Sequence, residues 1–167
     1  MNNTLEQALR YAEQGYYVRP NLSEQSLMPI ASTDDKVLHD WWQRYPEAGL
    51  ILDGPLNHLW FLRVLSDDLH LYQDLWSGHQ ILSPPLSLFN DEFRFIFRDP
   101  LEAFTWGDTL TGIKFISIDT FGLPVESLGN QYGQHNWAEN RSILQAPPPL
   151  LPDWLMEGLK PKQPELK

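Results

Sequence analysis

The stretch Asn57–Asp68, with the sequence NHLWFLRVLSDD, decides the fold of this chain. Residues 59–65, LWFLRVL, form a nearly continuous apolar run of strand-forming residues, which is typical of a buried strand. One arginine, Arg63, lies near the centre of this run, and the acids Asp67 and Asp68 come only after it ends. Because a buried charge is costly without a partner, position 63 needs an explanation beyond core packing.

Outward from this strand, helix and strand signals are spread along the whole chain. Apolar residues at helical spacing, with capping and stop residues at the ends, predict helices within residues 3–15, 32–46, 67–78 and 147–159. Runs of strand-forming residues predict strands at 16–20, 49–53, 59–65, 112–118 and 121–127, and a hairpin over 86–97 that turns at Asn90 and Asp91.

The arrangement of these elements predicts an α+β fold. Clustered strands beside interspersed helices favour a mixed, mainly antiparallel sheet flanked by helices, with a doubly wound α/β fold as the alternative. No glycine fingerprint follows any predicted strand, so a Rossmann site or a P-loop has no support. With 167 residues, 42% of them hydrophobic, the chain is expected to form one domain over residues 1–159, followed by a polar C-terminal tail at 160–167.

Local signals give finer expectations for the first two helices. Asn3 and Glu6 resemble a capping box at the start of the first helix, and Gly15 suits the position after its end. Ser32 or Thr33 is expected to cap the second helix. The buried stripe of that helix is expected to consist of Val37, Leu38, Trp41 and Tyr45.

The second strand of the predicted hairpin alternates aromatic and basic residues. Phe93, Phe95 and Phe97 share one face of a regular strand, while Arg94 and Arg98 take the other. The phenylalanines are therefore expected in the core, and stacking on nucleic-acid bases is their alternative role.

Composition excludes several kinds of site and partner. The absence of cysteine rules out disulfides and thiolate metal sites, and the five histidines have no ligand spacing, so neither a metal nor a cofactor is predicted. The net charge of −10, with 12 dispersed Lys and Arg, disfavours strong nucleic-acid binding. The N-terminus lacks the pattern of a signal peptide, and no apolar run approaches the ~20 residues that span a bilayer. The sequence thus predicts an acidic, soluble, cytoplasmic protein without a membrane partner.

Four stretches of the sequence carry a resemblance to a known family. They are residues 8–20 (ALRYAEQGYYVRP), 31–54 (ASTDDKVLHDWWQRYPEAGLILDG), 112–118 (GIKFISI) and 146–159 (APPPLLPDWLMEGL). In order and spacing, these resemble the N-terminal domain of bifunctional DNA primase–polymerases, within the archaeo-eukaryotic primase superfamily. The resemblance implies a primase-polymerase-like fold. It also implies a site where two aspartates on one strand, a later acid and a histidine would bind metal ions and a nucleotide.

None of these family residues is present in this sequence. The two aspartates correspond to Arg63 and Leu65, the histidine falls at about Phe93, and the later acid corresponds to Lys114. A cation at a metal-ligand position opposes metal binding, and leucine offers no lone pair. The resemblance therefore implies a degenerate, catalytically inactive relative, a pseudoenzyme, in which Arg63 marks a former catalytic position.

We interpret the chain as a binding or regulatory module with a link to DNA replication. The former cleft, lined by Arg63, Leu65, Phe93 and Lys114, is its expected ligand-binding site, and its expected partner is a protein or a second copy of the chain. A weaker alternative is a metal-independent site for a nucleotide or nucleic acid at Arg63 and Lys114.

A third hypothesis is that the chain is an active enzyme. In it, the shifted acids Asp67, Asp68 and Asp119 would serve a working nucleotidyltransferase. Acids at the start of a helix, such as Asp67 and Asp68, are also favoured by the helix dipole alone.

Overall fold

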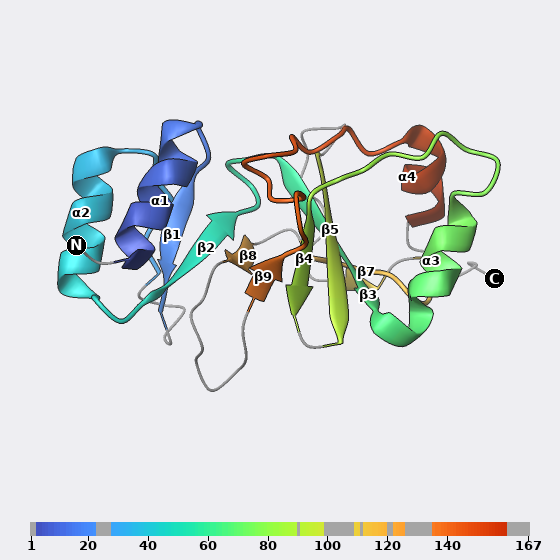
Figure 1. The fold of residues 1–167 in the computed structure, drawn as a ribbon, viewed down its shortest axis with the longest axis horizontal. Coiled ribbons are helices and arrows are strands. Elements are labelled where there is room, and N and C mark those ends of the chain that lie inside the picture. The colour runs from blue at the N-terminus through green and yellow to red at the C-terminus, as the bar shows by residue number, and fades with distance from the viewer. Residues whose placement is uncertain are drawn as a thin grey trace, which may run out of the picture.

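The computed structural model describes residues 3–22, 28–89, 91–98, 109–110, 112–119, 122–125 and 135–159. These residues form α-helices and two β-sheets, which confirms the predicted α+β fold (Figure 1). The sequence predicted one mixed sheet, whereas the named strands form two sheets in which every pairing is antiparallel. The helices are α1 (Asn3–Glu13), α2 (Asp35–Arg44), α3 (Leu69–Leu75) and α4 (Asp153–Leu159).

The smaller sheet has the strand order β1-β2-β8 and carries α1 and α2. Its strands are β1 (Val18–Asn21), β2 (Gly49–Asp53) and β8 (Gly122–Val125). Helix α1 buries Leu5, Ala8 and Tyr11, which recur at helical spacing, and α2 buries Leu38, Trp41 and Trp42. Together with the apolar side chains of the sheet, these residues form the first hydrophobic core.

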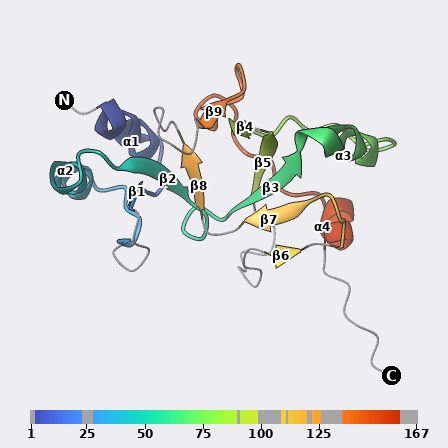
Figure 2. The same cartoon turned by 90° about the horizontal axis from the view of Figure 1, so that it is seen from below.

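The larger sheet has the strand order β6-β7-β3-β5-β4-β9. Its strands are β6 (Thr109–Leu110), β7 (Ser117–Asp119), β3 (Leu59–Leu65), β5 (Glu92–Arg98), β4 (Leu86–Phe89) and β9 (His135–Trp137). Helices α3 and α4 lie at the end of the molecule away from α1 and α2, as Figures 1 and 2 both show. They contribute Tyr72, Leu155 and Met156 to a second hydrophobic core, which also includes Trp76, the residue directly after α3.

Strand β3 belongs to both cores, and this explains its continuous apolar sequence. Leu59 and Phe61 point into the first core, while Trp60, Leu62 and Val64 point into the second. Arg63 and Leu65 continue the face of Phe61, but the side chain of Leu65 is 53% exposed. The first core therefore ends along this face between Phe61 and Leu65, and Arg63 lies at that boundary.

The β4–β5 hairpin has the predicted register. Phe89 pairs with Glu92, so the strands are joined by the two residues Asn90 and Asp91, the first of which lies outside the described residues. Phe95 and Phe97 are buried in the second core, and Phe93 is partly buried against it, as the alternation predicted.

Three local predictions were wrong. In α2 the buried residues are Leu38, Trp41 and Trp42, whereas Val37 and Tyr45 of the expected stripe are only partly buried. The expected strand at 112–118 is reduced to Ser117–Asp119, because the Ile116 N–H bonds the Ile113 carbonyl at 3.0 Å and closes a turn. The cap of α2 is Asp34, rather than Ser32 or Thr33. Its carboxylate accepts the N–H groups of residues 36 and 37 at the helix start, while the Ser32 hydroxyl accepts the Asp34 N–H at 2.9 Å.

Gly15 and the C-terminal segment also bear on the sequence predictions. Gly15, just after α1, has a φ of +90°, which a glycine adopts without strain.

The tail at 160–167 lies outside the described residues. None of the helices in the described ranges is long and apolar enough to cross a membrane.

A buried tyrosine in the second core gives a stability prediction. The Tyr72 ring stacks on Phe95 with a centroid distance of 4.1 Å. Apart from a weak contact with the Trp76 side chain, its buried hydroxyl makes no hydrogen bond of good geometry to the described residues. We expect Tyr72→Phe to raise the free energy of unfolding at neutral pH by about 1 kcal/mol, because it removes an unpaired polar group from the core. Urea unfolding of the two proteins would measure this difference.

The same hydroxyl makes stability depend on alkaline pH. Burial raises the pKa of Tyr72 far above its ordinary value of 10.0. A raised pKa in the folded state stabilises the fold fully below the unfolded pKa, and this contribution is lost as pH rises beyond about 10. The native chain should therefore lose stability above that pH more steeply than Tyr72→Phe. If the free energies of unfolding of the two proteins fell equally steeply above this pH, Tyr72 would not be the source of the pH dependence.

Candidate functional site

The candidate site is built on the face of β3 that leaves the first core. Arg63 lies opposite Arg94 of β5 on one side and Ser117 of β7 on the other, and Leu65 lies opposite Glu92. Side chains of residues directly opposite in an antiparallel pair share one face of the sheet. All five side chains therefore belong to the same face of the larger sheet.

Arg63 and Arg94 would repel each other if their charges were left unpaired. Arg63 is half-buried, and its Nε donates to the Ser117 Oγ at 3.2 Å. Arg94 is buried, and its Nη2 lies 3.2 Å from the Glu92 carboxylate. The Arg94 guanidinium also lies 5.7 Å from the centroid of the Phe89 ring. The two arginines therefore have different partners: Arg63 contacts Ser117 of the neighbouring strand β7, and Arg94 contacts Glu92 of its own strand β5.

A depression of about 250 Å³ opens on this face. Arg63, Leu65 and Lys114, three of the four predicted site residues, line it. Lys114 is exposed and lies in the turn that precedes β7. The other described residues that line it are Asp68, Glu92, Phe115, Ile116 and Ser117. We call this depression the Arg63 pocket.

Phe93, the fourth predicted site residue, does not reach the Arg63 pocket. It lies opposite Val64 in the register, and Val64 is buried in the second core. Because side chains alternate along a strand, Phe93 points to the far side of the sheet, where it lines a different cavity. The β5 residue that faces Arg63 is its neighbour Arg94.

The sequence pattern did not indicate Glu92 as a member of the site, and it left open whether Arg94 or Arg98 lies near Arg63. The alternation of β5 already placed Arg94 opposite the phenylalanines, but only the pairing of β5 with β3 brings it beside Arg63. The Nε of Arg94 is buried and has no hydrogen-bond partner among the described residues. This arginine therefore carries a desolvation cost that its contact with Glu92 offsets only in part.

The shifted acids do not come together. Asp67 and Asp68 lie in a short 3-10 helix directly after β3, and Asp68 lines the Arg63 pocket. Asp119 lies opposite Phe61, four residues before the end of β3, so about 13 Å of strand separates its position from Leu65. In the part of the chain that the structure describes, no three His, Cys, Asp or Glu residues are grouped to hold a metal ion.

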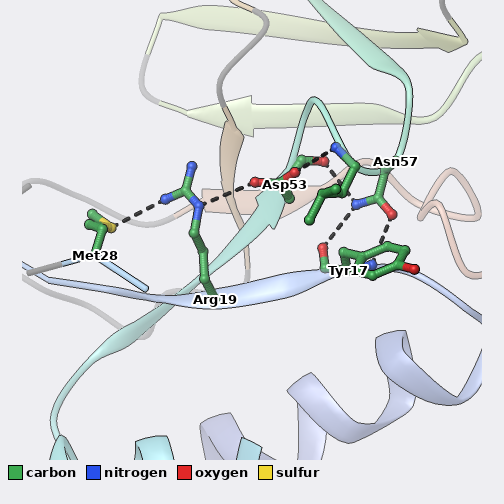
Figure 3. Close-up of polar contacts among 6 residues, drawn as sticks. Tyr17, Arg19, Met28, Asp53 and Asn57 are labelled. Carbon is green, nitrogen blue, oxygen red and sulfur yellow. Dashed lines mark hydrogen bonds and ion pairs between the residues drawn. The ribbon is translucent and has the colours of Figure 1, made fainter. Parts of the chain in front are cut away.

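A second polar cluster lies where the smaller sheet leads into β3 (Figure 3). Asp53, at the end of β2, is buried; its Oδ1 lies 3.3 Å from Arg19 Nε, and its Oδ2 accepts the Leu56 N–H at 2.8 Å. Asn57 bonds both the N–H and the carbonyl of Tyr17, at 2.8 and 2.9 Å. These bonds fasten the connection between β2 and β3 to the edge strand β1.

The Asp53 cluster is closely packed beside Gly122. A Cβ at Gly122 would lie 2.7 Å from Ile51 Cγ2 and 2.8 Å from Arg19 Nη2. Arg19 also donates to the sulfur of Met28 at 3.2 Å. We therefore assign this cluster a structural role, which is to fix the start of the strand that carries the candidate site.

The charges of the Arg63 pocket are balanced. Its described lining includes the cations Arg63 and Lys114 and the acids Asp68 and Glu92. A site for a polyanion needs an excess of cations, because each phosphate is neutralised by a basic group. This pocket offers mixed charges around one exposed leucine, which is an arrangement found at protein interfaces.

Comparisons with known proteins do not place this chain in a family. No family model matches it, and neither a curated protein nor a solved structure does. The functional inference therefore depends on the sequence resemblance, on the fold and on the geometry of the Arg63 pocket.

Proposed function

We propose that this chain is a catalytically inactive, primase-polymerase-like domain that acts as a binding or regulatory module. Its partner would be a protein or a second copy of the chain, and a link to DNA replication is what the sequence resemblance implies. The proposal is supported most directly by the Arg63 pocket. There, an arginine and an exposed leucine occupy the strand positions at which the resembled enzymes carry their aspartates.

A protein partner accounts for the pocket better than a phosphate ligand does. Leu65 offers apolar surface, and the surrounding cations and acids can each pair with a complementary group on a protein. The alternative of a metal-independent nucleotide or nucleic-acid site is favoured by one observation. Arg63 and Lys114 line the same depression, so both could contact one phosphate.

The nucleotidyltransferase alternative is disfavoured by the sheet register. Metal-assisted transfer needs carboxylates within a few ångströms of each other. Asp119 lies opposite Phe61 instead, whereas Asp68 lies beyond the end of β3. This separation weighs against the nucleotidyltransferase alternative.

Thermal unfolding with deoxynucleoside triphosphate separates these classes. For the native chain, we expect no change in Tm at millimolar nucleotide, either with Mn²⁺ or with EDTA. A ligand at about a hundred times its Kd would stabilise the fold by ~2.7 kcal/mol, which such a measurement detects easily. A rise that persists in EDTA and is lost in Arg63→Ala would support the anion alternative. A rise that requires Mn²⁺ would contradict the proposal.

Restoring the acids tests whether the Arg63 pocket is a former metal site. In the double variant Arg63→Asp/Leu65→Asp, two carboxylates lie two residues apart on one face of β3. We expect Mn²⁺ to stabilise this variant by about 1 kcal/mol, or roughly 2–4 °C in Tm, at a several-fold excess over Kd. The Tm of the native chain should not respond to Mn²⁺.

The matched control is Arg63→Ala/Leu65→Ala, which makes the same truncations without adding carboxylates. Its Tm should be independent of Mn²⁺. Equal Mn²⁺ responses in the two double variants would mean that the metal binds elsewhere on this acidic chain. That outcome would remove the argument that β3 once carried a metal site.

Sedimentation velocity tests the version in which the partner is a second copy. Leu65→Glu places an additional charge at the exposed apolar position of the pocket. If the native chain forms dimers, this variant should sediment as a monomer. A dimer that survives the substitution would show that the self-association surface lies elsewhere.

A further inference from the structure

A second cavity lies on the opposite side of the larger sheet from the Arg63 pocket. It has a volume of about 370 Å³ and lies between α3, the chain after that helix, and the β4–β5 hairpin. Small-molecule sites in proteins commonly have volumes of about 300–1,000 Å³. The cavity is therefore large enough for a compact ligand.

Aromatic rings form the walls of this cavity. Tyr72, Trp76, Phe93 and Phe95 all line it. The Tyr72 ring stacks on Phe95 at 4.1 Å and meets Trp76 edge-on at 6.2 Å between centroids. Since Tyr72 contacts both Phe95 and Trp76, these three rings are held in place, and this part of the wall is preformed and suits a flat, apolar molecule.

One cation, Arg141, is the main polar feature of the described lining. Its side chain is half-buried, and its Nε and Nη2 both donate to the Pro84 carbonyl, at 3.1 and 2.6 Å. No carboxylate among the described residues lies within ion-pair distance of it. No acidic residue is among the described residues that line the cavity either.

The environment of Arg141 is unfavourable for its charge. Burial lowers the pKa of Arg141, which reflects the loss of hydration around the guanidinium. The carbonyl of Pro84 fixes the guanidinium but does not neutralise it. An anion beside it would supply the missing counter-charge and a charge-assisted hydrogen bond.

We propose that this cavity binds a small planar aromatic molecule carrying one carboxylate, with the ring between the aromatic walls and the carboxylate at Arg141. The mouth of the cavity supports such an occupant. Ile81 lines the cavity and yet is 77% exposed, so a bound ring would cover an apolar side chain that is otherwise in water. The binding is independent of the Arg63 pocket, because Phe93 and Arg94 point to opposite faces of β5.

Isothermal titration calorimetry of the full chain with naphthoate and with naphthylmethanol tests this proposal. The two probes share the same ring and differ in their charge. We expect naphthoate to bind saturably, with one molecule per chain and about tenfold more tightly than the alcohol, because only the carboxylate forms a charge-assisted bond. In Arg141→Gln, the affinities for the two probes should become nearly equal.

Two further variants keep the test decisive. Arg44→Gln removes an arginine from the exposed face of α2, and it should leave the tenfold preference intact. Ser83→Trp places a large side chain at an exposed position of the cavity lining, and it should abolish naphthoate binding even if Arg141→Gln fails to fold. The proposal is overturned if naphthoate does not bind saturably at millimolar concentration. It is equally overturned if its affinity is unchanged in both Arg141→Gln and Ser83→Trp.

Discussion

Asp53→Ala is expected to lower the free energy of unfolding by about 3–5 kcal/mol, the largest effect that we predict for a single substitution in this chain. The Asp53 and Arg19 side chains are only 10% and 15% exposed, so removal of the carboxylate leaves the guanidinium largely desolvated and without this partner. The Leu56 N–H loses its acceptor as well. Denaturation in urea, followed by circular dichroism, would measure the change.

The matched control is the exposed ion pair between Asp40 and Arg44 on α2. Their N–O distance, 3.2 Å, is similar to that of the Asp53 pair, but the side chains are 51% and 67% exposed. Asp40→Ala should cost less than about 1 kcal/mol, because exposed pairs are screened by water and salt. If Asp53→Ala were no more destabilising than Asp40→Ala, the Asp53 cluster would not be what holds the start of β3.

The sequence predicted the elements of this fold better than it predicted their partners. The central strand at 59–65, the hairpin and the helices within the described residues all follow from local patterns of apolar residues and turn residues. Those patterns could not reveal two sheets. A strand that is apolar on both faces has the same sequence pattern whether it lies between two layers of one core or between two separate cores. Strand β3 lies between two separate cores.

The candidate site was predictable only where sequence neighbours settle the geometry. Arg63 and Leu65 share a face because they are two residues apart on one strand, and both line the pocket. The faces on which Phe93 and Arg94 lie depended instead on the register of β5 against β3, which no local sequence pattern contains. A shift of one residue in the strand register exchanges the two faces of β5. For this reason the β5 residue that faces Arg63 is Arg94 and not the expected Phe93.

Glu92→Ala is the second substitution with a large expected effect, a loss of about 2–3 kcal/mol in the free energy of unfolding. The Arg94 side chain is 11% exposed and that of Glu92 is 29% exposed, so the variant leaves a nearly buried guanidinium without its carboxylate. The contact with the Phe89 ring remains and keeps the loss below that for Asp53→Ala. Urea unfolding gives the value directly.

Arg94→Met tests whether the fold needs the charged side chain of Arg94 for its stability. Replacing a buried ion-pair member by an apolar side chain of similar length removes the desolvation cost, including that of the unpaired Nε. We therefore expect Arg94→Met/Glu92→Ala to recover most of the stability that Glu92→Ala loses. A double variant as unstable as Glu92→Ala would show that the fold itself needs the guanidinium. Recovery would mean that the buried guanidinium of Arg94 lowers the stability of the fold and that folding does not require it.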